Sequence, residues 1–520
     1  MGGYVGGASW RAQARRLRPG RHSVSRVMLG AVRPRPRESV GMTSAPQATT
    51  QPNIIFIMAD DMGYGDPGCY GATKVPTPNM DRLAAEGVRF TDAHSTSAVC
   101  TPSRYGVLTG RYCWRSRLQR WVLWGHSQPL IEEGRLTVAS MLKQHGYATA
   151  AIGKWHLGLG WHWTTDGVQD DDNTEDGSNI DYTKPIAGGP LTRGFDHFFG
   201  ISGSLDMPPY CFIQGDRTVG VPDREKEPYN PQQRKGLMVE GWQDEKVDVT
   251  FAQEACSFIR EHREAKPDEP FFLYLTPSAP HRPCVVPAFM AGRSQAGPRG
   301  DMVCLVDWML GQIMQTLDGL GIADNTLVML TSDNGARPAD VDGDTHGHKS
   351  CGDWRGHKAD IWDGGHREPF VARWPGRIPP GSVSDEPVCL TDLMATCAAI
   401  IDHDLPDDAG EDSHNLLPAM VGEDCGAPIR EALVHHSGDG MFSIRQGPWK
   451  LILGLGSGGF SQPRREEPQP DGAPGQLYNM DDDPAETTNL YGKRRDVVER
   501  LTALLDAYKQ HGRSAPGRGN

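Results

Sequence analysis

The sequence predicts an α/β protein: a mixed, mostly parallel sheet with helices on both faces, followed by a small C-terminal α+β subdomain. Apolar runs of strand length recur along the chain and alternate with helical segments, which is typical of a parallel sheet covered by helices. Beyond residue 429 the runs shorten and alternate, as antiparallel strands do. We therefore divide the chain into 1–51, a disordered leader or a mis-assigned start; 52–428, the main domain; 429–508, the C-terminal subdomain; and 509–520, a disordered tail.

The elements of the main domain follow from local signals. The run Asn53–Ala59 ends at two aspartates and glycine-rich turn residues, which indicates a buried parallel strand. Thr77 and Pro78 then give a helix N-cap with proline in the first turn, and Gly87 ends that helix. Further strands are predicted from Val88 and at Ala148–Ile152, Phe271–Leu275 and Leu327–Ser332, with helices such as Met302–Leu317 between them.

The C-terminal subdomain has its own pattern. Phe442–Arg445, Trp449–Leu453 and Gln476–Asn479 are predicted to be short strands, and Lys493–Tyr508 to be a helix. A loop rich in glycine, proline and charge separates the second strand from the third.

Composition excludes several classes of protein. The net charge of −13 and the pI of about 5.8 argue against a general nucleic-acid or membrane-surface binder. The 11 cysteines are odd in number and lack CxxC pairs, so neither a complete disulfide framework nor a structural zinc site is expected. The Arg-rich leader has only Val27–Val32 as an apolar stretch, too short for a secretory signal. We expect a cytoplasmic protein, with twin-arginine export through Arg15 and Arg16 as the alternative.

Charged and polar residues follow the carboxyl ends of four predicted strands. Open α/β sheets bind their ligands in the crevice outside those strand ends, so we expect these groups to converge. They are Asp60 and Asp61, Lys154 and His156, His281, and Asp333 and Asn334. The four oxygen donors among them, Asp60, Asp61, Asp333 and Asn334, suit a hard cation, calcium before magnesium.

The segment Ala98–Gly110 carries the strongest chemical signal. It contains Cys-x-Pro-Ser-Arg, and Pro102 suits the first turn of a helix, which puts Cys100 at the positive helix end. A structural or redox cysteine with a low pKa is the alternative interpretation. In the second segment, Gly146–His156, Lys154 and His156 lie two apart in an extended stretch, so both can face one side. They offer a fixed positive charge and a group that exchanges protons near neutral pH.

Both segments closely resemble the two signatures of the sulfatase family, in which the cysteine is oxidised to formylglycine. The resemblance spans roughly residues 52–505 and implies an alkaline-phosphatase-like fold, hydrolysis of sulfate esters, and a maturation enzyme as partner. It further implies that Cys100 becomes the formylglycine, that Arg104 holds it, and that the four oxygen donors bind calcium. Similarity to the arylsulfatase and N-acetylgalactosamine-6-sulfatase group favours a sulfated carbohydrate as substrate.

Three further site residues rest on this resemblance. His281, in Pro-His-Arg-Pro, resembles the family histidine on the leaving-group side. Lys358 resembles the second active-site lysine, although Asp363 stands where a longer Glu is usual and Glu368 where a small or apolar residue is common. Ser204 resembles a family serine that hydrogen-bonds near the sulfate, with Ser202 as a competitor. Ser204, Lys154, His281 and Lys358 are thus the predicted substrate-binding residues.

Other polar segments allow two interpretations each. His346, His348, Cys351 and His357 suggest zinc, but their spacing favours a polar loop that lines the substrate site. His435-His436 and Trp114–Trp124 are candidate sugar or anion subsites, or ordinary surface loops. Asp170–Asp172 could bind calcium, but the spacing of its glycines and carboxylates favours a solvated insertion loop.

We therefore predict a calcium-dependent hydrolase that releases inorganic sulfate through a formylglycine nucleophile. One alternative is a phosphonate or phosphodiester hydrolase of the same superfamily. The other is a non-catalytic binder of sulfated glycans that keeps Cys100 as a thiol.

Overall fold

The computed structural model describes residues 51–164, 177–337 and 346–517, all within the unit formed by residues 50–520. The predicted leader, except for its last residue, and the acidic loop Asp170–Asp172 lie outside the described residues. All 11 cysteines are free thiols. Among the described residues, no helix is both long and apolar enough to span a bilayer.

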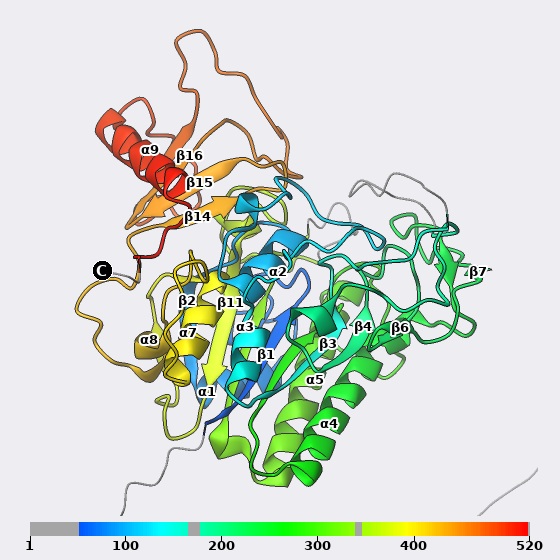
Figure 1. The fold of residues 1–520 in the computed structure, drawn as a ribbon. Coiled ribbons are helices and arrows are strands. Elements are labelled where there is room, and N and C mark those ends of the chain that lie inside the picture. The colour runs from blue at the N-terminus through cyan, green and yellow to red at the C-terminus, as the bar shows by residue number, and fades with distance from the viewer. Residues whose placement is uncertain (1–50, 165–176, 338–345, 518–520) are drawn as a thin grey trace, which may run out of the picture. The chain divides into compact units, whose positions relative to one another are not determined.

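A mixed, mostly parallel sheet forms the centre of this unit (Figure 1). Its middle strand β1 (Asn53–Ala59) lies between β10 (Thr326–Ser332) and β9 (Phe271–Thr276) and is parallel to both. Next to β9, β3 (Ala148–Lys154) and β4 (His197–Ile201) continue the parallel part. Beyond β10 come β11 (Arg367–Arg373), which runs antiparallel to its neighbours, β2 (Val88–His94), β12 (Ser382–Ser384) and β13 (Val388–Cys389), and beyond β4 come β5 (Ile213–Gln214) and β6 (Arg217–Thr218).

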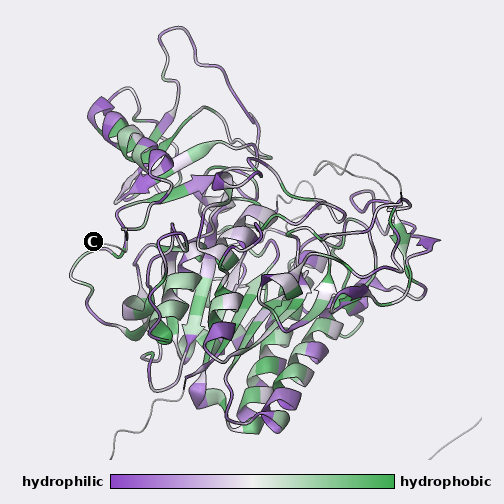
Figure 2. Cartoon of the chain, viewed as in Figure 1, coloured by the Kyte–Doolittle hydropathy of each residue, from purple (hydrophilic) through white to green (hydrophobic). Residues whose placement is uncertain are grey.

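Helices cover both faces of the sheet, as the sequence predicts. Alternate residues of a strand point to opposite faces, so Ile54 and Phe56 of β1 belong to one core and Ile55 and Ile57 to the other. The first core is shared with α2 (Cys100–Thr109), α3 (Val138–Gln144) and α7 (Leu393–Ile400). The second is shared with α1 (Pro78–Ala85), α4 (Val247–Ala265) and α5 (Gly297–Leu320). The apolar colour in Figure 2 follows these strands and the inner sides of the helices.

Helix α2 begins directly after an extended residue, Val99, and carries Pro102 in its first turn. Proline fits there because the first backbone N–H groups of a helix have no intrahelical acceptor. The helix ends at Gly110, whose left-handed φ of 63° a glycine adopts without strain. Cys100 therefore stands at the first position of a buried helix, as the sequence predicts.

The C-terminal residues form a second, antiparallel sheet. Its order is β14 (Leu433–His436), β15 (Phe442–Gln446), β16 (Trp449–Ile452) and β17 (Gln476–Asn479). Helix α9 (Arg495–Gln510) packs its apolar face, including Leu501 and Leu505, on this sheet. Of the remaining short elements, α8 is Leu417–Val421, and β7 (Arg224–Glu225) pairs with β8 (Leu237–Met238).

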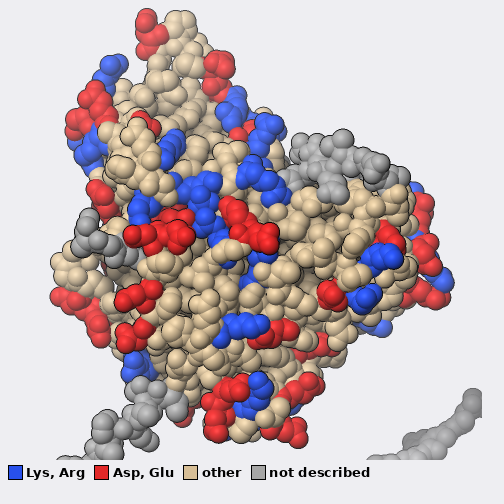
Figure 3. Space-filling view, in the orientation of Figure 1, with Lys and Arg blue, Asp and Glu red and all other residues tan. Residues whose placement is uncertain are grey.

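Charged side chains of both signs are interspersed over the face seen in Figure 3. A basic stretch broad enough to follow a nucleic-acid backbone is not seen on that face. The charges that matter for chemistry are buried at the strand ends instead.

Candidate active site

The predicted site residues meet at the carboxyl ends of the central strands, beside the start of α2. Asp60 and Asp61 follow β1, Asp333 and Asn334 follow β10, Lys154 ends β3, and His281 follows β9. These side chains are almost fully buried, the most exposed being His281 at 5%. Lys358 and Arg104 reach the same point from a loop and from α2. Asp61 and Asn334, 273 positions apart in sequence, thus meet in one centre because their strands are parallel.

Each carboxylate of the centre is paired with one basic side chain. The Nζ of Lys154 lies 2.6 Å from Asp60, and the Nζ of Lys358 lies 2.5 Å from Asp61. The guanidinium of Arg104 donates two hydrogen bonds to Asp333, at 3.0 and 2.6 Å. The negative charges of these three acids are thus balanced by two lysines and one arginine.

Two buried oxygens of the centre have no hydrogen-bond partner: Asp61 Oδ2 and Asn334 Oδ1. Asn334 turns its amide nitrogen to Asp61 Oδ1, at 2.7 Å, so its oxygen points elsewhere. Ligand atoms of Asp60, Asp61, Cys100 and His281 lie within 4.8 Å of one another. Since unsatisfied buried oxygens are costly and carboxylate and amide oxygens suit hard cations, the residues present fit a divalent cation.

Contacts of Arg299, Asp66 and His348, which the sequence did not predict, hold the backbone of Asp61. Asp61 has a φ of 67°, unusual for a residue with a side chain. Its carbonyl oxygen accepts a 2.8 Å hydrogen bond from Arg299, which also pairs with Asp66 at 2.7 Å. His348 contacts the same Asp66 at 2.8 Å. Burial would raise the pKa of Asp66, but the charge of Arg299 and these hydrogen bonds lower it to about 2.

The thiol of Cys100 lies between acidic and basic groups. Its Sγ is 3.4 Å from Asp60 Oδ1 and 3.4 Å from the Nζ of Lys358. Burial, followed by the negative charge of Asp333, raises the pKa of this thiol far above its ordinary value. Burial at this position therefore favours the neutral thiol, which is a poor nucleophile.

One ring nitrogen of His156 has no hydrogen-bond partner among the described residues. Its Nε2 donates to the carbonyl oxygen of Leu123 at 2.7 Å, so Nδ1 carries the lone pair and has no partner. Burial and the charge of Lys154 lower the pKa of His156. Thr101, next to Cys100, donates to the backbone oxygen of His156 at 3.0 Å. The neutral ring can therefore accept a proton.

His281 is oriented by its own loop. Its Nδ1 donates to the carbonyl oxygen of Arg282 at 2.7 Å, and its Nε2 lies 3.7 Å from Asp61 Oδ2. Burial and the charge of Lys358 lower the pKa of His281. Nε2 is thus the nitrogen that faces the centre.

Ser204 does not contact this centre directly in the structure. Its hydroxyl donates to the buried carboxylate of Asp206 at 2.6 Å. Asp206 in turn pairs with Arg234 at 2.8 Å and with Arg282 at 3.1 Å. The serine lies near His281 through this network, and no sequence motif singled out Asp206.

The other sequence candidates are dispersed. His348 contacts Asp66. His357 shares a hydrogen bond with Ser461 at 3.1 Å, and its Nδ1 lies 3.0 Å from Asp360. Groups in the described part of the chain that are close enough to share a cation do not combine these histidines with Cys351. His435 and His436 are buried in β14, which contradicts their interpretation as surface loops or open sugar subsites.

His435 instead joins a buried histidine cluster with His94 and His366. Their ligand atoms lie within 4.8 Å of one another, but the rings of His366 and His435 stack in parallel, 3.8 Å apart and at 11°. Lone pairs lie in the ring plane, so two stacked rings do not aim at one ion. Beside the cluster, Lys450 is paired with Asp363 at 2.7 Å. Asp363, which stands where the family usually has Glu, therefore contacts the surroundings of this cluster. The cluster connects β2 and β11 with the C-terminal sheet.

Buried histidines predict a loss of stability in acid. Burial lowers the pKa of His94 and of His436 to about 4, with Arg367 and Lys509 adding to it. In the unfolded chain the value is about 6.5, so protons bind the unfolded state first as pH falls below that value. Each histidine is expected to remove up to about 2 kcal/mol between pH 7 and 5. Replacing His436 by Phe should flatten the pH dependence of the urea unfolding free energy by that amount, and unchanged slopes would contradict it.

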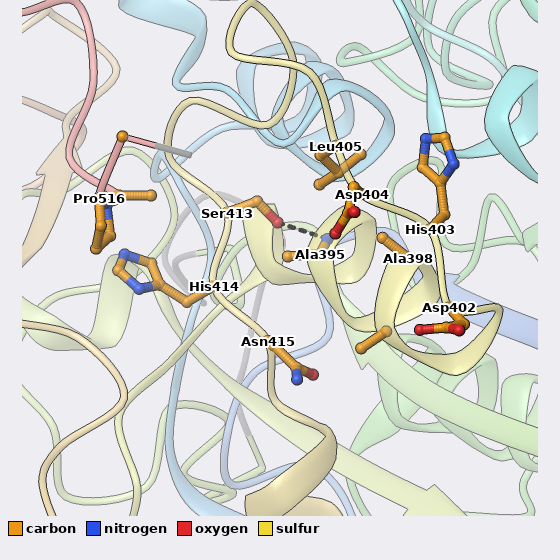
Figure 4. Close-up of a pocket in the computed structure, with 13 residues that line it drawn as sticks. Ala395, Ala398, Asp402, His403, Asp404, Leu405, Ser413, His414, Asn415 and Pro516 are labelled. Carbon is orange, nitrogen blue, oxygen red and sulfur yellow. Dashed lines mark hydrogen bonds between the residues drawn. The ribbon is translucent and has the colours of Figure 1, made fainter. Parts of the chain in front are cut away.

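A separate hollow of about 420 Å³ lies at the end of α7 (Figure 4). His403, His414 and Asp402 line it but point in different directions in this view, and His403 bonds His145 at 3.0 Å. Its polar groups do not converge on a point, so it lacks the arrangement that catalysis requires.

Comparison with known proteins agrees with this geometry. The sequence profile of the Sulfatase family matches residues 52–403. An N-acetylgalactosamine-6-O-sulfatase of Bacteroides thetaiotaomicron is 36% identical over 506 residues, covering 89% of this chain and 94% of that protein. Human arylsulfatase A is 32% identical over 505 residues, covering 90% and 91%. A structure solved in a study of glycosaminoglycan metabolism by Bacteroides thetaiotaomicron superposes with a TM-score of 0.75 at 32% identity, covering 89% of this chain and 100% of that one.

The fold and the buried centre, which is lined with lysine and arginine side chains, define an alkaline-phosphatase-like α/β hydrolase, as the resemblance implied. The chain belongs to the sulfatase family, and it is a sulfuric ester hydrolase.

Proposed function

We propose that this sulfatase removes sulfate from a sulfated carbohydrate, with a formylglycine at position 100 and calcium at Asp60, Asp61, Asp333 and Asn334. The observation that carries the proposal is residue 100 itself: it opens a buried helix, and Lys358 lies 3.4 Å from its side chain. The relatives named as N-acetylgalactosamine-6-sulfatases support a sulfated sugar. A formylglycine-generating enzyme is then the required partner.

The metal proposal rests on the two unpartnered oxygens, Asp61 Oδ2 and Asn334 Oδ1. A bound calcium would act as a Lewis acid toward the sulfate oxygens. Since lysines and arginine already balance the three acids, the added ion would give the centre a net positive charge. That charge favours an anionic ester in a site that burial shields from water.

Each basic side chain has a task in this proposal. Lys154 contacts Asp60 and Lys358 contacts Asp61, so both ammonium groups lie at the centre and can bind the sulfate oxygens. Arg104 is held by Asp333 and by the carbonyl oxygen of Lys154, at 3.0 Å, and so keeps the first turn of α2 in place. Formylglycine would supply, as its hydrate, the hydroxyl nucleophile that the neutral thiol of Cys100 cannot replace.

The two histidines divide the proton transfers. The Nδ1 of His156 is the general base in this proposal, because the lowered pKa keeps the ring neutral and this nitrogen has no hydrogen-bond partner among the described residues. The Nε2 of His281 faces the centre and would protonate the departing oxygen, which requires that substrate binding raise its lowered pKa. Lys358 is the alternative donor, since its charged Nζ lies 3.4 Å from the Sγ of residue 100.

Replacing His281 by Ala is expected to lower kcat/KM about 10²–10⁴-fold on an alkyl or sugar sulfate, because a basic alkoxide cannot leave unprotonated. A nitrophenyl sulfate has a good leaving group, so much of its turnover should survive. His156→Ala should slow both esters alike. The measurement is kcat/KM across leaving groups of graded pKa. Equal losses for His281→Ala on all esters would assign the proton donor to Lys358.

A comparison of sulfate and phosphate esters tests the reaction itself. Matched nitrophenyl sulfate, methyl phosphonate and phosphodiester substrates should give the highest kcat/KM for the sulfate. A preference for the phosphodiester would make the chain a phosphoryl-transfer member of the superfamily. Sulfated-glycan binding without turnover of any ester, by protein that carries formylglycine at position 100, would make it a binding protein.

A further inference from the structure

A continuous series of contacts joins the loops of the two catalytic histidines. Leu123 accepts the hydrogen bond of His156, and the next residue, Trp124, lies 4.4 Å from the guanidinium of Arg234. Arg234 donates from Nη1 to Asp206 at 2.8 Å. The residues of this series come from segments that are far apart in sequence, so the fold assembles them here.

The series continues from Asp206 to the second histidine. Arg282 contacts the same carboxylate oxygen through Nε and Nη2, both at 3.1 Å. The carbonyl oxygen of Arg282 accepts the hydrogen bond of His281, at 2.7 Å. One carboxylate therefore holds two guanidinium groups, and one of these belongs to the residue next to the proposed proton donor.

The exposure of these groups differs in a way that matters for binding. The side chain of Asp206 is 3% exposed, whereas that of Arg282 is 18% exposed and that of Arg234 is 35% exposed. Two guanidinium groups share one carboxylate, so this surface keeps a positive charge. A buried acid and a stacked indole fix the position of Arg234, which lowers the entropy lost when it binds a ligand.

We propose that Arg234 and Arg282, positioned by Asp206 and Trp124, form a subsite for an anionic group on the leaving-group side of the scissile sulfate. The inference rests on the proposed function, because His281 defines that side. A guanidinium fork matches the planar edge of a carboxylate and the oxygens of a sulfate. The ligand is thus a sugar chain that carries a uronic acid or a second sulfate next to the sugar being desulfated.

Substrate charge gives the test. Matured full-length enzyme is assayed on an uncharged sulfated disaccharide, on the same disaccharide with a uronic acid, and on one with a second sulfate. The wild type should prefer at least one charged substrate over the uncharged one. Arg234→Ala should lower that kcat/KM ratio about tenfold, as the loss of one charged hydrogen bond does. Arg234→Lys should keep part of the ratio, because it keeps the charge but loses the fork.

Arg494→Ala is the matched control. Arg494 also stacks on a tryptophan, Trp449 at 4.6 Å, and also pairs with an acid, Asp496 at 2.8 Å, but it precedes α9 in the C-terminal region. Its replacement should leave the ratio unchanged. The ratio of the wild type should also fall as salt is added, since Arg234 is partly exposed.

The outcomes separate the two proposals. A wild type without preference for charge, or equal losses for Arg234→Ala on charged and uncharged substrates, overturns the subsite alone. The uronic acid and the second sulfate are separate arms, so the substrate with the larger loss identifies the anion. Failure of the matured enzyme to turn over any ester, nitrophenyl sulfate included, overturns the proposed function and the subsite with it.

Discussion

Cys100→Ala abolishes sulfate ester hydrolysis, with an expected loss in kcat of at least about 10⁴-fold, because the site then lacks its nucleophile. Cys100→Ser should be nearly as inactive in protein made without a maturation enzyme, since a serine hydroxyl at this position lacks the aldehyde of formylglycine. Residue 100 is 2% exposed and opens α2, so alanine should fit there without disturbing the fold. The measurement is release of inorganic sulfate from nitrophenyl sulfate.

Cys211→Ala is the control for the loss of a buried thiol. Cys211 is fully buried, and burial raises the pKa of its thiol as it does for Cys100. The Cys211→Ala variant is expected to be less stable than the wild type but to keep its kcat at temperatures where it is folded. Residual turnover by Cys100→Ala above about one part in 10² of the wild type would contradict the role of residue 100 as nucleophile.

Asp61→Asn is expected to lower calcium affinity and activity together, with a loss of about 10³-fold in kcat/KM at limiting calcium. Asn keeps the shape of Asp but removes the charge that pairs with Lys358, and it replaces the unpartnered oxygen or its neighbour by an amide NH2 group. Chelation of the wild-type enzyme should give a similar loss, and added calcium should reverse it. Calcium titration by calorimetry alongside turnover measures both effects.

Asp307→Asn provides the matched control for this substitution. Asp307 is a buried carboxylate that accepts backbone hydrogen bonds from Asn79 and Met80 at the start of α1. Burial raises its pKa to about 6, so its ionised form is favoured less than that of Asp61, whose pKa is lowered by Lys358. The Asp307→Asn substitution should leave the calcium titration unchanged. Full activity of exhaustively chelated wild-type enzyme would contradict the metal assignment.

The sequence predicts much of this fold because its signals are local. Asn53–Ala59 is one uninterrupted apolar run, and such runs occur where a strand is covered on both faces. The charged residues after β1, β3 and β10 could be assigned to one centre, because parallel strands end at one edge. Strand β11 was not predicted, because its sequence Arg-Glu-Pro-Phe-Val-Ala-Arg has no long apolar run, and its reversed direction has no local signal.

The supporting contacts escaped prediction because they depend on tertiary structure. Arg299 holds the backbone of Asp61 from a helix 238 residues later, and no local pattern marks it. Asp206 lies two residues after the predicted Ser204 and belongs to no motif. It is nevertheless the acid that holds the loop of His281 through Arg282. Likewise His94, His366 and His435 lie far apart in sequence and meet only where the C-terminal sheet packs on the main one.

The central claim is that residue 100 acts as a formylglycine. The most direct measurement is mass spectrometry of the tryptic peptide Phe90–Arg104 from purified protein, made with and without a formylglycine-generating enzyme, alongside sulfate release by the same samples. We predict that turnover rises in proportion to the fraction of peptide that carries an aldehyde in place of the thiol. Undiminished turnover by protein whose peptide carries only the free cysteine would contradict the account.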